Sequence, residues 1–297
     1  MTRPVTVGVD GYPESRAAAD WAAKEALLRE APLRVVHADE WPRVPAVPPV
    51  DREEHRRWAD TVLDEASGEL RRRYPELAVS ARRLTGRAAA VLAVEAADSQ
   101  MLVLGSRGRG AVEGFLVGSV GTAAIGLTDT PVVLVRPAAK SPSGAPESRP
   151  PGGVAVGRDV VVGVDIHETT DAVLAFAFEE AARRGCGVRA VHGWSLPFAF
   201  SYAPGLDPGV RQEVADGIAG AVAERLRPWR GLYPSVKAEE RVLVGAPAEQ
   251  VLYEAADAEL VVVGRRIRRA PVGGHLGHVA HAVLHHATAP VAVIAHD

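Results

Sequence analysis

The stretch MLVLGSRGRGAVEGFLVGS, residues 101–119, contains the signals that decide the fold. Its first residues, Met101–Leu104, form a short apolar run that predicts a buried β-strand, and the residues after Ser119 have helical spacing. Glycines between the two elements follow the pattern G-x2-G-x9-G-S, at Gly105, Gly108, Gly118 and Ser119. A strand, a glycine-rich loop and a helix in this order suit a phosphate chain, because glycines admit close backbone approach and a helix start offers unpaired N–H groups.

The composition bounds the class of protein. The chain has 297 residues, 47% of them hydrophobic and 24% charged, so its length predicts about two domains. A net charge of -3 gives no general attraction for nucleic acid or for an anionic membrane. The single cysteine, Cys186, excludes an internal disulfide and fits a reducing cytosol. The start of the chain does not resemble a signal peptide and no apolar run reaches the ~18 residues of a membrane span, so we expect a cytoplasmic protein.

The sequence repeats itself. VTVGVD, ending at Asp10, recurs 155 positions later as VVVGVD, ending at Asp165. EAAD, beginning at Glu95, recurs 159 positions later at Glu254, so the second copy has gained about four residues between its second and third strands. Residues 138–158 are rich in Pro, Ser and Gly and predict a flexible linker. The predicted domains are therefore residues 1–137 and 159–297.

Each copy alternates strands with helices. In the first copy we expect strands near 5–10, 33–38, 77–84, 101–105 and 132–136, and helices over 17–30, 51–73, 87–97 and from 119. In the second copy we expect strands near 160–165, 188–192, 236–243, 260–264 and 291–295. Strands that are nearly continuous in Val, Leu and Ile and alternate with helices indicate a parallel sheet covered on both faces. The predicted fold class is α/β, with a five-stranded, doubly wound sheet in each domain and ligands at the carboxyl ends of the strands.

Asp10 is a second candidate ligand residue. It follows the first strand, whereas the glycine loop follows the fourth, so the two lie close together if these strands are neighbours in the sheet. The simpler interpretation is a turn residue that hydrogen-bonds its own loop, with Gly11 and Pro13 beside it and Ser15 as the N-cap of the following helix. Its recurrence as Asp165 does not decide between the two, because a duplicated turn would also keep it.

Three segments, VTVGVDGYPES, LVLGSRGRGAVEGFLVGSV and PVVLVRP, together resemble the universal stress protein family, as a tandem two-domain member of the actinobacterial type. The resemblance implies Rossmann-like domains of the adenine-nucleotide α-hydrolase type that bind ATP, for which G-x2-G-x9-G-[ST] is the family's signature. In such a domain Asp10 contacts the adenine, and ribose and phosphates, with Mg²⁺, are held by Gly105, Gly108, Gly118 and Ser119.

The same resemblance implies a biological role and partners. Members act in stress survival, dormancy or regulation and are not defined by one turnover reaction, so we expect no enzyme. They pair through their last strands, which implies pairing of the two domains within the chain, or a homodimer, through residues 132–136 or 291–295. A slow ATPase or nucleotidyl transferase, and an interaction scaffold with an incidental nucleotide site, are the alternatives.

The second copy departs from the signature. Ile267 replaces the second glycine and His278 replaces the serine. A branched side chain disfavours positive φ and would crowd a phosphate, so we expect weak or no ATP binding in the second domain. The surrounding arginines either bind a phosphate electrostatically or form a solvated basic loop; they are Arg265, Arg266, Arg268 and Arg269.

Three histidines share one predicted helical face, as a metal site requires: His278, His281 and His285. The opposite face contains Val279, Val283 and His286 and is expected to face the core. We therefore expect three exposed histidines and no metal. His275 and His278 also form an H-x-G-H sequence that resembles a nucleotidyl-transfer signature, but here it follows the fourth strand instead of the first.

Overall fold

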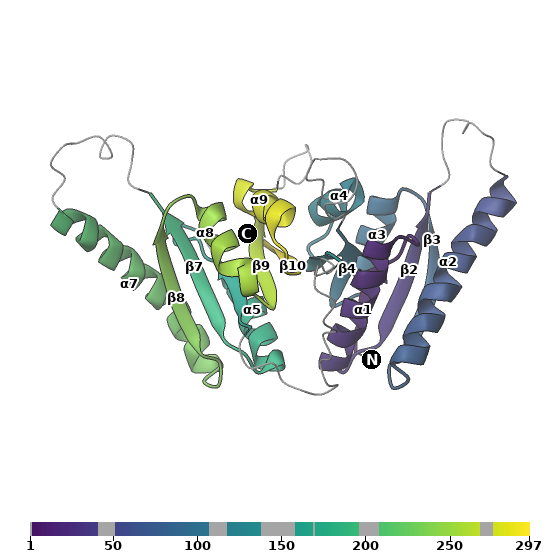
Figure 1. The fold of residues 1–297 in the computed structure, drawn as a ribbon, viewed down its shortest axis with the longest axis horizontal. Coiled ribbons are helices and arrows are strands. Elements are labelled where there is room, and N and C mark those ends of the chain that lie inside the picture. Colours follow the sequence, from purple (N-terminus) through teal and green to yellow (C-terminus); the bar gives the residue numbers. More distant parts are fainter. Residues whose placement is uncertain are drawn as a thin grey trace, which may run out of the picture. The chain divides into compact units, whose positions relative to one another are not determined.

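The computed structural model describes residues 2–40, 51–106, 118–137, 158–168, 170–195, 208–267 and 276–297 (Figure 1). The chain divides into two compact units, of which domain 1 contains strands β1 to β5 and domain 2 contains β6 to β10. The predicted linker, apart from Arg158, lies outside the described residues, as do the proline-rich segment 41–50 and residues 107–117, which include Gly108.

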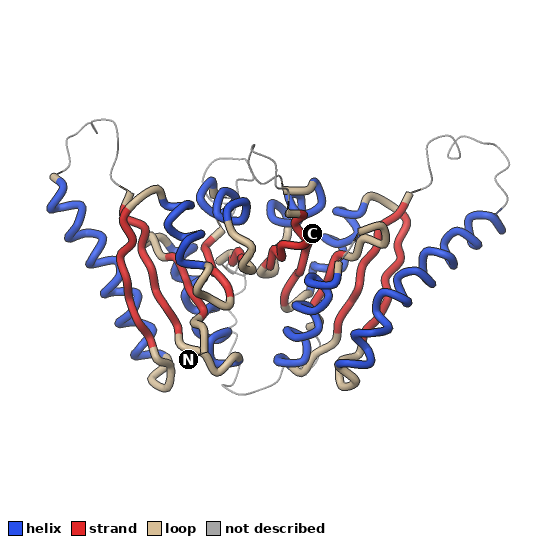
Figure 2. The backbone as a smooth tube through the Cα atoms, turned by 180° about the vertical axis from the view of Figure 1, so that it is seen from behind, coloured by secondary structure: helices blue, strands red, loops and turns tan. Residues whose placement is uncertain are grey.

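Domain 1 is an α/β layer with a parallel sheet. Its elements in the described residues are β1 (Val5–Gly8), α1 (Pro13–Leu28), β2 (Leu33–Asp39), α2 (Arg52–Arg73), β3 (Val79–Thr85), α3 (Ala88–Ala96), β4 (Met101–Gly105), α4 (Ser119–Leu127) and β5 (Val132–Val135). The strand order is β3-β2-β1-β4-β5, with Val7 of β1 opposite Val35 of β2 and Val103 of β4. Helices α1 and α2 pack on one face and α3 and α4 on the other, as Figure 1 and the reverse view in Figure 2 allow the reader to follow. The predicted doubly wound sheet is confirmed.

Domain 2 repeats this plan. Its elements in the described residues are β6 (Val160–Gly163), α5 (Asp171–Arg184), β7 (Val188–Trp194), α7 (Pro208–Leu232), β8 (Ala238–Val244), α8 (Pro247–Glu254), the 3-10 turn η1 (Ala255–Asp257), β9 (Leu260–Arg266), α9 (His278–His286) and β10 (Val291–His296). The parallel order is β10-β9-β6-β7-β8, which matches β5-β4-β1-β2-β3 of domain 1. Helices α5 and α7 pack on one face and α8 and α9 on the other.

The central strands are apolar throughout because both faces of each sheet are covered. Val5, Val7 and Val103 are fully buried, as are Val160 and Val162 in domain 2. Helix α1 can approach the sheet closely because its inner face is built from alanines, which leave no bulky side chain between backbone and strands; these are Ala18, Ala19, Ala22, Ala23 and Ala26.

The duplication extends to a buried ion pair on the first helix of each domain. At the end of α1, the Nε of the C-cap residue Arg29 lies 2.5 Å from Glu25 Oε1, and the two side chains are 6% and 1% exposed. Arg184 and Glu180 form the equivalent pair in α5, where Glu180 is fully buried. A charge that is removed from water needs such a partner, so each pair constrains the end of its helix.

A second charged cluster is also duplicated. Glu95 of α3 is 7% exposed and lies between Arg34 of β2, at 2.5 Å, and Arg82 of β3, at 3.2 Å. In domain 2, the carboxylate of Glu254 lies 3.2 Å from Arg189 of β7 and 3.8 Å from Arg241 of β8. These clusters link a helix to the two outer strands of each sheet.

Within the part of the chain that the structure describes, no helix has the length and apolar character needed to cross a membrane.

Candidate functional site

The ends of β1 and β4 define a switch point in domain 1. These strands are neighbours, and the chain leaves β1 towards β2 and β3 on one side but leaves β4 towards β5 on the other. Asp10 follows β1 and Gly105 ends β4, so the structure brings the two sequence-predicted positions to adjacent strand ends. In open parallel sheets, a crevice at such a point is where ligands bind.

Asp10 forms a turn of its own. Its Oδ1 accepts a hydrogen bond from the backbone N–H of Tyr12, at 3.1 Å, and Gly11 between them has a φ of 82°. Asp165 of domain 2 makes the same turn, accepting from the N–H of His167 at 2.9 Å. The turn interpretation is therefore observed in both copies. Because the Asp10 side chain is exposed, the turn also holds its carboxylate at the strand end, facing solvent.

Ser15 stabilises this turn but does not cap the helix. Helix α1 begins at Pro13, with Tyr12 as its N-cap, so the prediction that Ser15 is the N-cap was wrong. Proline suits the first helical position because its missing N–H would have no partner there. The Ser15 hydroxyl instead donates to the carbonyl of Tyr12, at 2.9 Å, and accepts from the N–H of Asp10, at 3.2 Å.

The two described glycines of the signature have different surroundings. A Cβ atom at Gly105 would lie 2.6 Å from the carbonyl carbon of Glu14 and 2.8 Å from the nitrogen of Ser15, so β4 ends directly against the first turn of α1. A Cβ atom at Gly118 would meet no described atom within 4 Å, and the φ of this residue is −55°. Glycine is therefore required by packing at Gly105 but not at Gly118.

Helix α4 begins without a side-chain cap. Gly118 is its N-cap residue, and Ser119, its first residue, is exposed. The first N–H groups of a helix have no partner within the helix and carry a partial positive charge, so an anion is stabilised in front of them. This start of α4 and the end of β4 are the described parts of the predicted phosphate site.

Sequence reasoning missed His37, which supports the strand end before Asp10. The ring is 4% exposed, and its Nδ1 lies 2.8 Å from the carbonyl oxygen of Val9, to which it donates. His192 makes the same contact with Val164 in domain 2, at 2.9 Å. The repetition of this histidine between the copies was the signal that could have revealed the contact.

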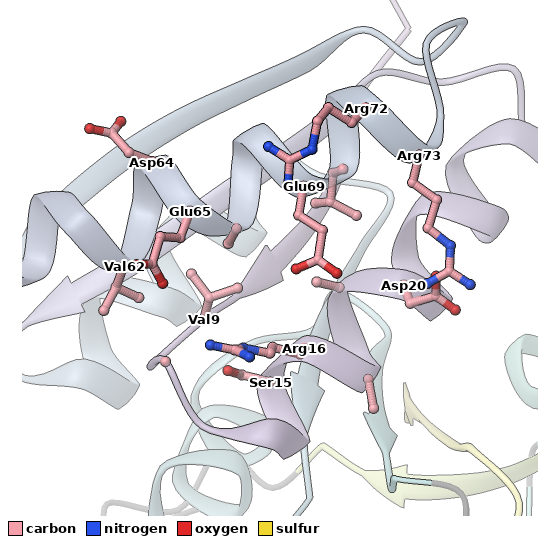
Figure 3. A pocket seen from close by; sticks show the side chains of 15 residues that line it. Val9, Ser15, Arg16, Asp20, Val62, Asp64, Glu65, Glu69, Arg72 and Arg73 are labelled. Carbon is pink, nitrogen blue, oxygen red and sulfur yellow. The ribbon is translucent and has the colours of Figure 1, made fainter.

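A cavity of about 600 Å³ lies between α1 and α2 (Figure 3). It begins at Val9 and Gly11, on either side of Asp10, and Figure 3 shows Arg16 of α1 opposite Glu65 and Glu69 of α2. Its lining includes neither Asp10 nor Gly105, so the cavity adjoins the switch point and does not contain it. The i, i+4 spacing of the two glutamates was visible in the sequence, but their position beside Arg16 depends on how the helices pack.

Asp20 lies at one end of this cavity and makes the stability of domain 1 depend on pH. Burial alone raises the pKa of its carboxyl, but hydrogen bonds from Lys24 and Tyr74, at 2.8 and 2.6 Å, and the positive charges of Lys24 and Arg73 bring the pKa below its ordinary value of 3.8. Because the folded-state pKa is the lower one, ionised Asp20 stabilises the fold above the unfolded pKa, and this contribution disappears as the pH falls through the folded pKa.

We therefore expect Asp20→Asn to be about 1 kcal/mol less stable than the parent chain at pH 6, a modest value because the Asp20 side chain is partly exposed to solvent. The difference should narrow when urea unfolding is measured below about pH 4. Asp64→Asn, at an exposed carboxylate of the same cavity, is the control and should show no such pH-dependent difference. A difference at Asp20 that stayed constant down to pH 3 would contradict this assignment.

The corresponding strand end of domain 2 contacts other side chains of the domain. Strand β9 continues past Gly264 to Arg266 and pairs with β10 as far as His296. A Cβ atom at Gly264 would lie 2.7 Å from His296 Nε2. Arg266 forms an ion pair with Glu168 of the loop after β6.

The predicted solvated basic loop is wrong for Arg265, which belongs to β9 and is only 4% exposed. Arg266 is exposed and forms an ion pair with Glu168, whereas Arg268 and Arg269 lie outside the described residues. Ile267 follows β9 directly and does not have a positive φ. Among the described non-glycine residues, only Glu30 has one.

The histidine face of α9 is partly as predicted. His278 and His281 are exposed, and the ring centroids of His281 and His285 lie 4.3 Å apart. The expectation that His286 faces the core was wrong, because it is exposed and the buried face consists of Ala280, Val283 and Leu284. The described residues contain no cluster of metal-binding side chains.

The fold and the strand ends define the class of protein: two tandem Rossmann-like α/β domains, of which the first keeps the full glycine signature at its switch point and the second does not. The sequence profile described as "Universal stress protein family" matches residues 1–136 and 157–295. The chain therefore belongs to the universal stress protein family, which confirms the resemblance.

Relatives and solved structures agree with this assignment. The universal stress protein Rv2005c of Mycobacterium tuberculosis is 35% identical over 303 residues, covering 97% of this chain and 96% of that protein. A universal stress protein of Mycolicibacterium smegmatis is 33% identical over 297 residues, covering 98% and 96%. The crystal structure of a universal stress protein from Archaeoglobus fulgidus covers 99% of both chains with a TM-score of 0.66 and 15% identity, and it supports the fold.

Proposed function

We propose that this chain is a nucleotide-binding regulator of stress response or dormancy, in which domain 1 holds ATP with Mg²⁺. The observation that carries the proposal is the switch point, where Asp10 and the end of β4 stand on adjacent strands. The uncapped start of α4, where a Cβ atom at Gly118 would meet no described atom within 4 Å, adds donors suited to a phosphate chain. Asp10 would contact the adenine, and the Gly105, Gly108, Gly118 and Ser119 region the ribose and phosphates.

Binding, not turnover, is the role that the described residues support. The donors at the start of α4 are N–H groups, which fit a phosphate, and the Ser119 hydroxyl, whose oxygen could also ligate Mg²⁺. With so few protein oxygens there, Mg²⁺ would be held mainly by phosphate oxygens and water. Asp10 is the one carboxylate at the described strand ends of this site, and its Oδ1 already accepts a hydrogen bond in the turn. Steady-state turnover of ATP in the presence of Mg²⁺ should therefore be negligible.

Pairing of the two domains, or of two chains, through their last strands stays a prediction.

One functional site per chain follows from the difference between the domains. In domain 2, the strand end continues to Arg266, which pairs with Glu168, and the signature residues Gly108 and Ser119 are replaced by Ile267 and His278. We expect isothermal titration with ATP and Mg²⁺ to give about one nucleotide per chain, and mass spectrometry of small molecules released by denaturation to identify ATP or ADP. Two equivalent tight sites would contradict the asymmetry, and absence of binding by the intact chain would contradict the proposed function.

A further inference from the structure

Ser106, the residue after Gly105, is a buried hydroxyl without a partner. The residue is 1% exposed, and its backbone N–H donates to the carbonyl of Val135 at 2.7 Å, which extends the pairing of β4 with β5. Its Oγ, however, has no hydrogen-bond partner among the described residues. A buried hydroxyl left in this state costs about 1–3 kcal/mol, so the fold alone gives no reason to keep it.

The other buried hydroxyls of domain 1 in the described residues have partners. Thr6 and Ser99, for example, lie 2.7 Å apart, and the Ser99 hydroxyl also donates to the carbonyl of Glu95 at 3.0 Å. The remaining ones likewise make hydrogen bonds; they are Ser15, Ser67 and Thr128. Ser106 is thus an exception, and it stands at the switch point.

Strand geometry gives the direction of the Ser106 side chain. A Cβ atom at Gly105 would point at the first turn of α1, and successive side chains along a strand point to opposite faces. Ser106 therefore points to the face that α3 and α4 cover. Its hydroxyl lies at the carboxyl end of β4, on the same side of the sheet as the uncapped N–H groups of α4.

We propose that the Ser106 hydroxyl donates a hydrogen bond to a phosphate group of the nucleotide in front of α4. This inference rests on the proposed nucleotide site of domain 1 and adds a binding residue at a position that the glycine signature leaves undefined. Domain 2 provides the contrast, because Arg265 occupies the equivalent position, and there the strand pairing continues to Arg266 and His296. The domain with the degenerate signature has not kept the hydroxyl.

The test is Ser106→Ala in the full chain, with ATP and adenosine as probes. We expect the dissociation constant for ATP to rise about tenfold, as for the loss of one hydrogen bond to a charged group, and that for adenosine to stay unchanged. The melting temperature of the nucleotide-free protein should be unchanged or higher, since no hydrogen bond within the described residues is lost.

Two matched variants separate binding from folding. Ser99→Ala removes hydrogen bonds to Thr6 and to the Glu95 carbonyl, so it should lower the melting temperature and leave ATP affinity unchanged. Thr170→Val removes the other buried hydroxyl without a partner among the described residues, in domain 2, and should leave ATP affinity unchanged without loss of stability.

The failure of this inference is distinguishable from failure of the proposed function. If the parent chain binds ATP and Ser106→Ala binds it equally well, the role of Ser106 is overturned and the nucleotide site stands. An equal loss of adenosine affinity, or a lower melting temperature of the free protein, would also overturn it, because either result would assign the hydroxyl to the nucleoside or to the fold. A parent chain that does not bind ATP overturns both.

Discussion

Glu25→Ala is expected to lower the free energy of unfolding of domain 1 by about 3–5 kcal/mol. Glu25 is 1% exposed and its Oε1 lies 2.5 Å from the Nε of Arg29, which is itself 6% exposed. Removal of the carboxylate takes away the negative charge that lies 2.5 Å from the Nε of a buried guanidinium. Urea unfolding of the full chain should show the loss, and hydrogen exchange of α1 peptides should locate it in domain 1.

Two further variants test the cause. Glu25→Leu combined with Arg29→Leu removes both charges and should recover most of the lost stability, because neither charge then has to leave water. In this double variant, Gln100 loses the hydrogen bond that Arg29 Nη1 donates to it, at 3.1 Å. It keeps the hydrogen bond from its own Nε2 to the carbonyl of Arg3. Glu53→Ala, which breaks an exposed pair with Arg56, should cost less than about 1 kcal/mol. Equal losses at Glu25 and Glu53 would show that burial is not the cause.

The sequence was sufficient for the fold because parallel strands that are buried on both faces are apolar runs. Every predicted strand is present, and self-comparison identified the two copies. The ends were harder: β9 continues through Arg265 and Arg266, whose charges suggested a loop, because β10 offers a partner as far as His296. Side-chain type therefore located the strands, whereas backbone pairing decided where they stop.

Buried charges could not be predicted in the same way. Glu25 and Arg29 have the i, i+4 spacing that is typical of an exposed helical pair, and only the packing of α1 shows that both are buried. The candidate site has the same difficulty, since a glycine pattern does not separate a residue that admits a ligand from one that admits a neighbouring helix. Gly105 and Gly118 both belong to the pattern, but a side chain would clash at Gly105 alone.

Gly105→Ala and Gly118→Ala are therefore expected to affect different properties: the first lowers the stability of the fold, and the second lowers the affinity for ATP. At Gly105 the new methyl group would lie 2.6 Å from the Glu14 carbonyl carbon, and since backbone cannot move aside easily, we expect a loss of about 2–3 kcal/mol of stability. At Gly118 the methyl group meets no described atom, so stability should change by less than about 1 kcal/mol. The same methyl group would face a bound phosphate at the start of α4, and we expect ATP affinity to fall by about tenfold or more.

Gly277→Ala is the matched control for the second effect, because Gly277 is the N-cap residue of α9 and also has open space at its Cβ position within the described residues. It should leave both stability and ATP binding nearly unchanged, since domain 2 is not expected to hold nucleotide. Calorimetric melting and ATP titration of the three variants give the answer. If Gly105→Ala kept its stability and lost only ATP, the glycine would be a ligand residue and not a packing one. If Gly277→Ala lost ATP as Gly118→Ala does, the nucleotide would have to involve domain 2, and the asymmetric site would be wrong.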